Sequence, residues 1–252
     1  MRISIINQKG GVGKSTTTAN LAVVLAKDHK KRVLVIDWDG QANVSAFLGL
    51  SASPGWGNTQ LVLEPTSGFH PARDVLVAGL DVVPGAPDFA LVERQLLGDL
   101  IGGPRRLRRA IEPIYKQYDV ILTDCGPTLG MLAINAVAAC PDILVPIELA
   151  HAALLGAMTL QKFLAEAQAS LEPSIRTLGV LPTFHDDREK TPREILGDLT
   201  KLFGSNVFHT TIHNAANVRD AAGQGKPVVL LDPSSRGAAE YRALAQEVVN
   251  RG

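Results

Sequence analysis

A glycine-rich segment near the start of the chain combines the residue types that bind phosphate. It reads KGGVGKST and runs from Lys9 to Thr16. Its glycines permit backbone angles and a close approach that a Cβ would forbid, so that successive N–H groups can converge on one anion. Lys14 adds a positive charge for the β- and γ-phosphates, and the Ser15 hydroxyl is a usual ligand of Mg²⁺. The spacing predicts a site for a nucleoside triphosphate and its magnesium ion.

Two acidic clusters each follow a short apolar run. Asp37 and Asp39 end the run that begins at Arg32, and Asp124 follows the run Val120–Leu122. Carboxylates at alternate positions of an extended chain point the same way, and at the carboxyl end of a sheet strand they face the ligand crevice. Beside a triphosphate and Mg²⁺, such groups can hold the water shell of the metal, contact it directly or orient an attacking water.

The elements that must position these groups alternate along the chain. Apolar, β-branched runs predict strands, and helical spacing predicts helices between them. We expect Ser51–His70, which is rich in Gly, Pro, Ser and Thr, to be an irregular connection. The alternation predicts a doubly wound, mainly parallel α/β sheet with helices on both faces and with the site at its carboxyl edge. The expected strands are 3–6, 32–37, 80–83, 120–122, 142–146 and 177–181, and the expected helices are 19–27, 89–100, 105–115, 152–169 and 238–250.

Length and composition restrict the function classes. A chain of 252 residues fits one α/β domain, residues 1–252, and zero formal net charge gives no bulk electrostatic case for nucleic acid. The arginines between Arg105 and Arg109 could bind nucleic acid, but an amphipathic helix with a charged outer face explains the same spacing. Only two cysteines, Cys125 and Cys140, indicate a reducing compartment, and no apolar run is long enough to span a bilayer.

The phosphate-binding segment departs from the plain phosphate-loop pattern. Gln8 stands where that pattern has glycine, and Lys9 adds a second lysine. This resembles the deviant Walker A motif of the ParA/MinD family, a P-loop NTPase family of the SIMIBI type. The later clusters resemble the family patterns DxDPQxN and DCPPSLG, with Gly40 and Gly126 in place of prolines and Thr128 in place of serine. Resemblance to ParA/Soj-type partition ATPases extends over essentially the whole chain.

The resemblance implies a Mg²⁺-dependent ATPase that forms a homodimer with ATP. Lys9 would reach the partner's nucleotide, Lys14 would bind the phosphates, and Asp39 would position the hydrolytic water. The metal ligands or their neighbours would be Ser15, Asp37 and Asp124. In relatives a segment equivalent to His213–Asn217 covers the adenine. The implied nucleotide-binding residues are Gly10, Gly11, Val12, Gly13, Lys14, Ser15, Thr16, Asn214 and Asn217.

The same resemblance implies partners. In relatives the ATP dimer binds DNA without sequence preference, and a ParB-like centromere-binding protein stimulates hydrolysis. We expect a cytoplasmic, nucleoid-associated protein of chromosome or plasmid partition. The C-terminal helix has no basic face with bulky apolar anchors, so no membrane partner is expected. The candidate DNA-binding residues are Arg188, Lys190, Arg193, Lys201 and Arg219.

Several alternatives remain open at this stage. The same switch could position a protein cargo or act on a membrane matrix, as MinD does. Cys125 and Cys140 could share an iron–sulfur cluster across a dimer. His185–Asp187 could be a metal cluster, although consecutive residues in a loop favour a polar turn, and His151 is expected at the surface. The family's Gln and Glu after the Val-Pro dipeptide are replaced by Glu148 and Ala150.

Overall fold

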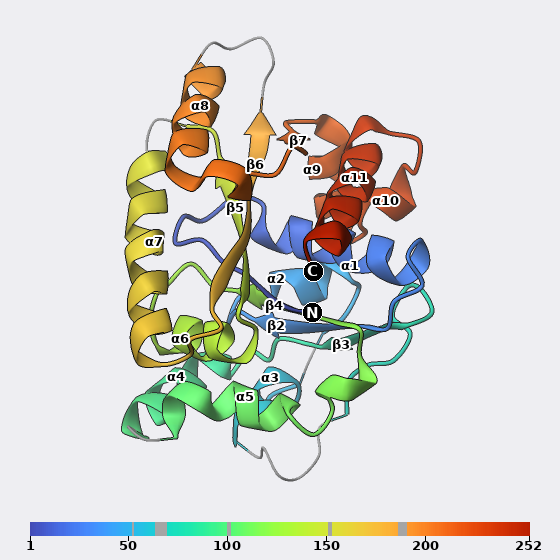
Figure 1. The fold of residues 1–252 in the computed structure, drawn as a ribbon. Coiled ribbons are helices and arrows are strands. Elements are labelled where there is room, and N and C mark those ends of the chain that lie inside the picture. The colour runs from blue at the N-terminus through green and yellow to red at the C-terminus, as the bar shows by residue number, and fades with distance from the viewer. Residues whose placement is uncertain (52, 64–69, 100–101, 151–152, 186–190) are drawn as a thin grey trace.

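A computed structural model describes residues 1–51, 53–63, 70–99, 102–150, 153–185 and 191–252. Its centre is a seven-stranded sheet in the order β3-β2-β4-β1-β5-β6-β7, in which every neighbouring pair is parallel. This confirms the predicted doubly wound sheet (Figure 1). The strands are β1 Arg2–Ile5, β2 Val33–Trp38, β3 Leu80–Val83, β4 Val120–Cys125, β5 Asp142–Glu148, β6 Arg176–His185 and β7 Ile212–His213.

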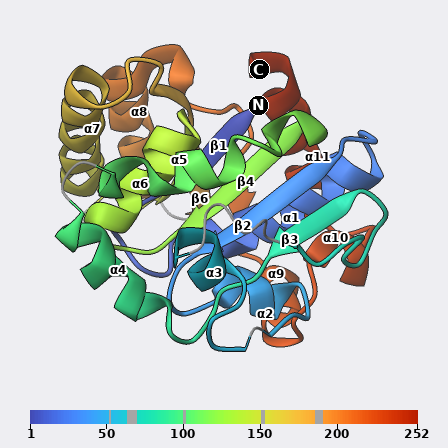
Figure 2. The same ribbon diagram turned by 90° about the horizontal axis from the view of Figure 1, so that it is seen from below.

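Helices cover both faces of the sheet, as Figures 1 and 2 show. Along β2, Leu34 and Ile36 belong to one buried apolar cluster and Val33 and Val35 to the other, because side chains alternate across a strand. The first face carries α3 Asn58–Leu63, α4 Phe89–Gly98, α5 Arg106–Ile111, α6 Met131–Ala139, α7 Ala153–Ser170 and α8 Thr191–Phe203. The second carries α1 Lys14–Lys27, α2 Asn43–Phe47, α9 Ala216–Gly223, α10 Val228–Leu231 and α11 Arg236–Arg251.

The strand register brings the predicted site groups to one edge. Asp37 at the end of β2 lies directly opposite Asp124 at the end of β4. Asp124 in turn lies opposite Ile5, the last residue of β1, after which the glycine-rich segment begins. Three strands that are distant in sequence therefore deliver the phosphate-binding segment and both acidic clusters to neighbouring positions at the carboxyl edge of the sheet.

Several predicted boundaries were wrong. The first helix begins at Lys14 rather than Ala19, because the glycine-rich segment leads directly into its first turn. The stretch 51–70 is not irregular throughout, since α3 lies within it and buries Asn58 and Leu61 against the core. The expected helix 105–115 ends at Ile111 and is followed by a single turn of 3-10 helix, Tyr115–Gln117.

Three of the four arginines of that segment contact other parts of the protein. Arg106 donates to Asp99 at 2.9 Å, Arg108 pairs with Glu172, and Arg105 donates to the Leu171 carbonyl at 2.8 Å. These contacts favour the structural interpretation of the arginine run over the nucleic-acid one. Among the described residues, no helix combines the length and the apolar character needed to cross a membrane.

Candidate nucleotide site

The glycine-rich segment is a loop that contacts with β5 and β6 hold in place. The Asn7 side chain donates to the Pro146 carbonyl of β5 at 2.7 Å and accepts from the Lys9 backbone N–H at 3.0 Å. The Thr183 hydroxyl of β6 donates to the Val12 carbonyl at 3.0 Å. Gly13, with φ of +86°, occupies the position before α1, where a residue with a Cβ would be strained. The loop is thus fixed in place before any ligand arrives.

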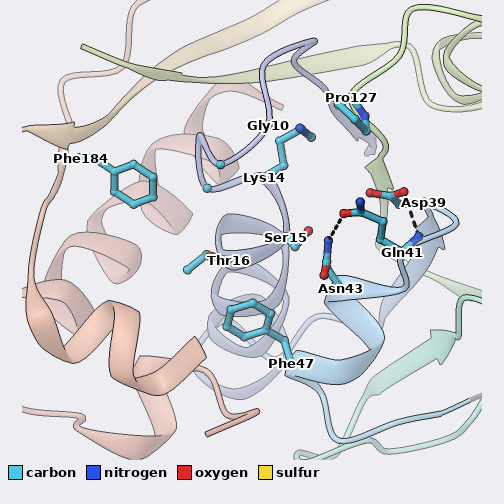
Figure 3. A pocket seen from close by; sticks show the side chains of 12 residues that line it. Gly10, Lys14, Ser15, Thr16, Asp39, Gln41, Asn43, Phe47, Pro127 and Phe184 are labelled. Carbon is cyan, nitrogen blue, oxygen red and sulfur yellow. Dashed lines mark hydrogen bonds between the residues drawn. The ribbon is translucent and has the colours of Figure 1, made fainter. Parts of the chain in front are cut away.

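A cavity of about 210 Å³ opens over this loop (Figure 3). Its lining includes Lys14 and Ser15 from α1, and Asp39 from the turn after β2. Lys14 is only 8% exposed, and its Nζ donates to the Lys9 carbonyl at 3.1 Å. Burial lowers the pKa of Lys14, although Asp124 opposes this shift. A buried ammonium at the start of a helix, beside the N–H groups of a glycine-rich loop, suits a polyphosphate.

Asp124 is the acid that β4 contributes to the site. It is fully buried, and its Oδ1 accepts from the Thr18 hydroxyl at 2.9 Å. Its Oδ2 is buried without a hydrogen-bond partner among the described residues. Burial, followed by repulsion from Asp37, raises the pKa of Asp124 to about 7. A divalent cation next to this oxygen would supply the missing partner and restore the charged form, so the residues present fit Mg²⁺.

Asp37 has a different environment. Its Oδ2 accepts from both the hydroxyl and the backbone N–H of Ser45, at 2.6 and 3.0 Å, and its Oδ1 accepts from the Asp39 N–H at 3.3 Å. Burial raises the pKa of Asp37 to about 6 despite these bonds. Gly85 N–H also donates to the Ser45 hydroxyl at 2.8 Å. Asp37 therefore anchors the turn before α2 in this structure, in addition to lying beside Asp124.

Asp39 reaches the cavity from the same turn. Its Oδ1 accepts from the Gln41 N–H at 3.1 Å, and the Gln41 side chain accepts from Asn43 at 3.1 Å. Gly126 lies beside it, since a Cβ at that position would be 3.3 Å from the Asp39 Oδ1. The carboxylate is half-buried and faces the cavity, where it can orient a water molecule near the phosphate end (Figure 3).

Lys9 does not point into the cavity of its own chain. Its Nζ pairs with the Glu148 carboxylate at the end of β5, and the two side chains are 45% and 35% exposed. Glu148 is the residue that replaces the family's glutamine, so this ion pair follows from one of the departures noted in the sequence. The pair holds Lys9 at the surface of the protein.

Of the residues expected near adenine and DNA, the described ones (Asn214, Asn217, Arg193, Lys201 and Arg219) are not among the residues that line the cavity. The Asn214 side chain accepts from Arg219 at 2.6 Å, and Asn217 donates to Asp232 at 3.3 Å. Lys201 pairs with Asp198 at 2.8 Å, and Arg193 is exposed on α8. Arg188 and Lys190 lie outside the described residues, as do His151 and most of the His185–Asp187 segment.

Sequence reasoning missed two aromatic residues of the site, Phe47 and Phe184, which both line the cavity. Their approach depends on the tertiary fold, and no local pattern marked them. Both cysteines are buried, and burial raises the pKa of Cys125 and that of Cys140, the latter to about 11. Buried, protonated thiols do not favour a cluster shared between two chains.

Comparison with known proteins supports the same interpretation. A family model described as an AAA domain (AAA_31) matches residues 1–177. The chromosome-partitioning ATPase Soj of Thermus thermophilus is 39% identical over 253 residues, which cover 99% of this chain and 96% of that protein. Cobyrinic acid a,c-diamide synthase from Mycobacterium smegmatis, with a bound ATP analogue and magnesium, is 28% identical with a TM-score of 0.81 over 98% of this chain and 93% of that one. The cell division ATPase MinD of Pyrococcus furiosus is 28% identical with a TM-score of 0.80, over 99% and 98%.

Proposed function

Since the chain belongs to the AAA_31 family and is a ParA/Soj-type ATPase, we propose that it is an ATP-dependent, dimerising switch for chromosome or plasmid partition. The observation that carries this proposal is the cavity at the carboxyl edge of the sheet, which a deviant phosphate loop and Asp39 line, with the buried Asp124 on the adjacent strand β4. Similarity to the Soj ATPase over nearly the whole chain supports the partition role.

In the proposed mechanism the loop from Gly10 to Thr16 and the Lys14 ammonium bind the phosphates of ATP. Ser15 and Asp124 would hold Mg²⁺, with Asp37 on the neighbouring strand, and the ion would supply positive charge beside the phosphates. Asp39 orients the hydrolytic water, because its carboxylate lines the cavity close to the Lys14 side of the loop. The products are ADP and phosphate.

Lys9 acts between two chains in this proposal. It leaves Glu148 when two ATP-bound copies close face to face, and it then neutralises charge on the partner's phosphates. Its exposure supports this role, since a lysine buried against its own loop could not reach a second chain. Hydrolysis removes the γ-phosphate that Lys9 contacts, and the dimer reopens.

The ATP dimer would bind DNA through phosphates, so binding would weaken as salt rises. The candidates are Arg188, Lys190, Arg193, Lys201 and Arg219, and a ParB-like protein would stimulate hydrolysis. Of these, Lys201 donates to Asp198 and Arg219 donates to Asn214, both at the exposed surface, where DNA phosphates can replace these partners. The protein would then reside on the nucleoid in the cytoplasm.

The test is binding of the intact chain to random-sequence duplex DNA at fixed salt with ATP, ADP or no nucleotide. We expect binding only with ATP, stronger and longer-lived binding by Asp39→Ala, and none by Lys14→Ala, which removes the phosphate-binding ammonium. Normal ATP hydrolysis by Asp39→Ala would refute the role of that carboxylate. DNA binding that is equally strong without nucleotide would refute the switch.

Similarity to MinD favours one second candidate, a positioning ATPase that acts on a protein or membrane matrix. The same experiment separates the two. If ATP drives dimerisation of the chain but no DNA binding appears at low salt, the nucleotide switch stands and the partner is a protein cargo or a membrane.

A further inference from the structure

The cavity over the phosphate loop has two chemically different ends (Figure 3). Asp39, Gln41 and Pro127 lie at one end, close to the Lys14 side. Phe184 and Phe47 lie at the other, on either side of Thr16. Lysine and acidic groups mark the terminal phosphates of a bound nucleotide. The nucleoside must therefore leave the loop in the opposite direction, toward the aromatic end.

The backbone of β6 is distorted at Phe184. The pairing of β6 with β7 shifts register between Thr183 and His185, and Phe184 has φ of +54°. A bulge re-aims side chains, and a non-glycine residue at positive φ is uncommon. In a regular strand Thr183 and Phe184 would point to opposite faces. Here the Thr183 hydroxyl contacts Val12 and the Phe184 ring contacts Gly13, so both face the phosphate loop.

The contact with Gly13 fixes the ring against the loop. A Cβ built on Gly13 would lie 3.1 Å from the Phe184 Cζ and 3.7 Å from both Cε atoms, so the ring edge rests on the glycine. Phe184 is partly exposed, and its remaining surface lines the cavity. Phe47, the last residue of α2, is also partly exposed and lines the same cavity. Two aromatic rings, one from β6 and one from α2, thus line the cavity on either side of Thr16.

Resting on the proposed function, we infer that Phe184 and Phe47 form an aromatic wall that holds the base and ribose of the bound nucleotide, and that they set the preference for a nucleotide over bare polyphosphate. Aromatic side chains stack on any base, and their apolar surface covers the ribose. The loop itself binds only the phosphates and cannot distinguish ATP from tripolyphosphate. Contacts of Phe184 and Phe47 with the base and ribose favour ATP over tripolyphosphate.

The test compares binding of ATP and of inorganic tripolyphosphate, both with Mg²⁺, by titration calorimetry on the full chain. The variants are Phe47→Leu and Phe184→Leu, which keep an apolar side chain but remove the ring, with Phe163→Leu on α7, remote from this cavity, as a matched control. We expect each site variant to bind ATP about tenfold or more weakly, given the strength of base stacking. Tripolyphosphate binding should not change, and the control should match the parent for both ligands.

Two results would overturn the inference. Equal losses for ATP and tripolyphosphate would mean that the rings only support the loop, and unchanged ATP binding in both site variants would mean that the nucleoside lies elsewhere. Failure of the parent chain to bind ATP at all is a different outcome, because it would refute the proposed nucleotide switch itself. A variant with Tyr at either position keeps the ring, and it should retain the ATP affinity of the parent.

Discussion

Replacing Asp124 by asparagine is expected to change how the stability of the nucleotide-free protein depends on pH. Burial and the neighbouring Asp37 raise the pKa of Asp124 from 3.8 to about 7 in the folded chain. A carboxyl group with a raised folded-state pKa contributes stability that is fully present below the unfolded pKa of 3.8. That contribution is lost as pH rises through about 7, because the unfolded chain has already released its proton while the folded chain still holds it.

The magnitude follows from the size of the shift. About three pKa units correspond to about 4 kcal/mol for a single isolated group. Asp124 and Asp37 lie opposite each other on adjacent strands, and their two negative charges repel each other. A proton on one carboxyl group therefore makes it easier for the other to ionise, and the two groups titrate as a pair. We therefore expect the free energy of unfolding of the parent to fall by about 2–4 kcal/mol between pH 5 and pH 8 on account of this pair. In Asp124→Asn much of that fall should disappear.

The assay is urea unfolding of parent and variant at pH 5, 6, 7 and 8, at one ionic strength and without nucleotide or Mg²⁺. Asp119→Asn is the matched control, since Asp119 is an exposed carboxyl whose pKa is lowered by hydrogen bonds from Arg32. It remains ionised over this range, so its variant should keep the slope of the parent even if it is less stable throughout. A slope in Asp124→Asn equal to that of the parent would refute the argument.

Two further predictions concern the same edge of the sheet. Glu148→Gln should favour the ATP dimer, because each closing chain must break a half-exposed Lys9–Glu148 pair worth about 0.2–1 kcal/mol. With two such pairs per dimer, sedimentation should show a dimer dissociation constant lowered by about 2- to 30-fold. A higher dissociation constant in the variant would contradict this. Ser45→Ala should destabilise the fold by about 1–3 kcal/mol, since it removes a donor to Asp37 and leaves the buried Gly85 N–H unpaired. Urea unfolding measures this change. A loss below about 0.5 kcal/mol would show that these hydrogen bonds contribute little to stability.

Sequence reasoning predicted the positions of those candidate site residues whose placement depends on residues close in sequence. The loop from Gly10 to Ser15 and the strand-end position of Asp124 both follow from residues close in sequence, and the structure brings them to one edge as expected. The different hydrogen-bond environments of Asp37 and Asp124 could not be predicted. They depend on Ser45 of α2, which donates both its hydroxyl and its backbone N–H to Asp37, while the Thr18 hydroxyl of α1 donates to the Oδ1 of Asp124.

The aromatic end of the cavity escaped prediction for a similar reason. Phe184 lies in an apolar strand pattern that places it on the opposite face from Thr183, and only the register shift against β7 turns it toward the loop. The helix α3 was missed because glycine, proline and serine dominate the flanking sequence. Its position depends on Asn58, whose side chain donates to the Asp37 carbonyl at 2.8 Å and accepts from the Ala86 N–H at 2.8 Å.

The charges of the site explain why ligand binding and stability should be linked. Lys14 is buried with a lowered pKa, whereas Asp37 and Asp124 are buried with raised ones, so the folded chain disfavours the charged forms of both signs. The negative triphosphate favours the charged form of Lys14, and the divalent cation favours the charged forms of the two aspartates. Part of the binding free energy therefore comes from offsetting the cost of these buried charges. Asp124→Asn should consequently be more stable than the parent without ligand at pH 8, yet gain less in melting temperature from Mg²⁺ and ATP. Equal rises in melting temperature in the two proteins would mean that the Asp124 carboxylate does not interact with the bound ion.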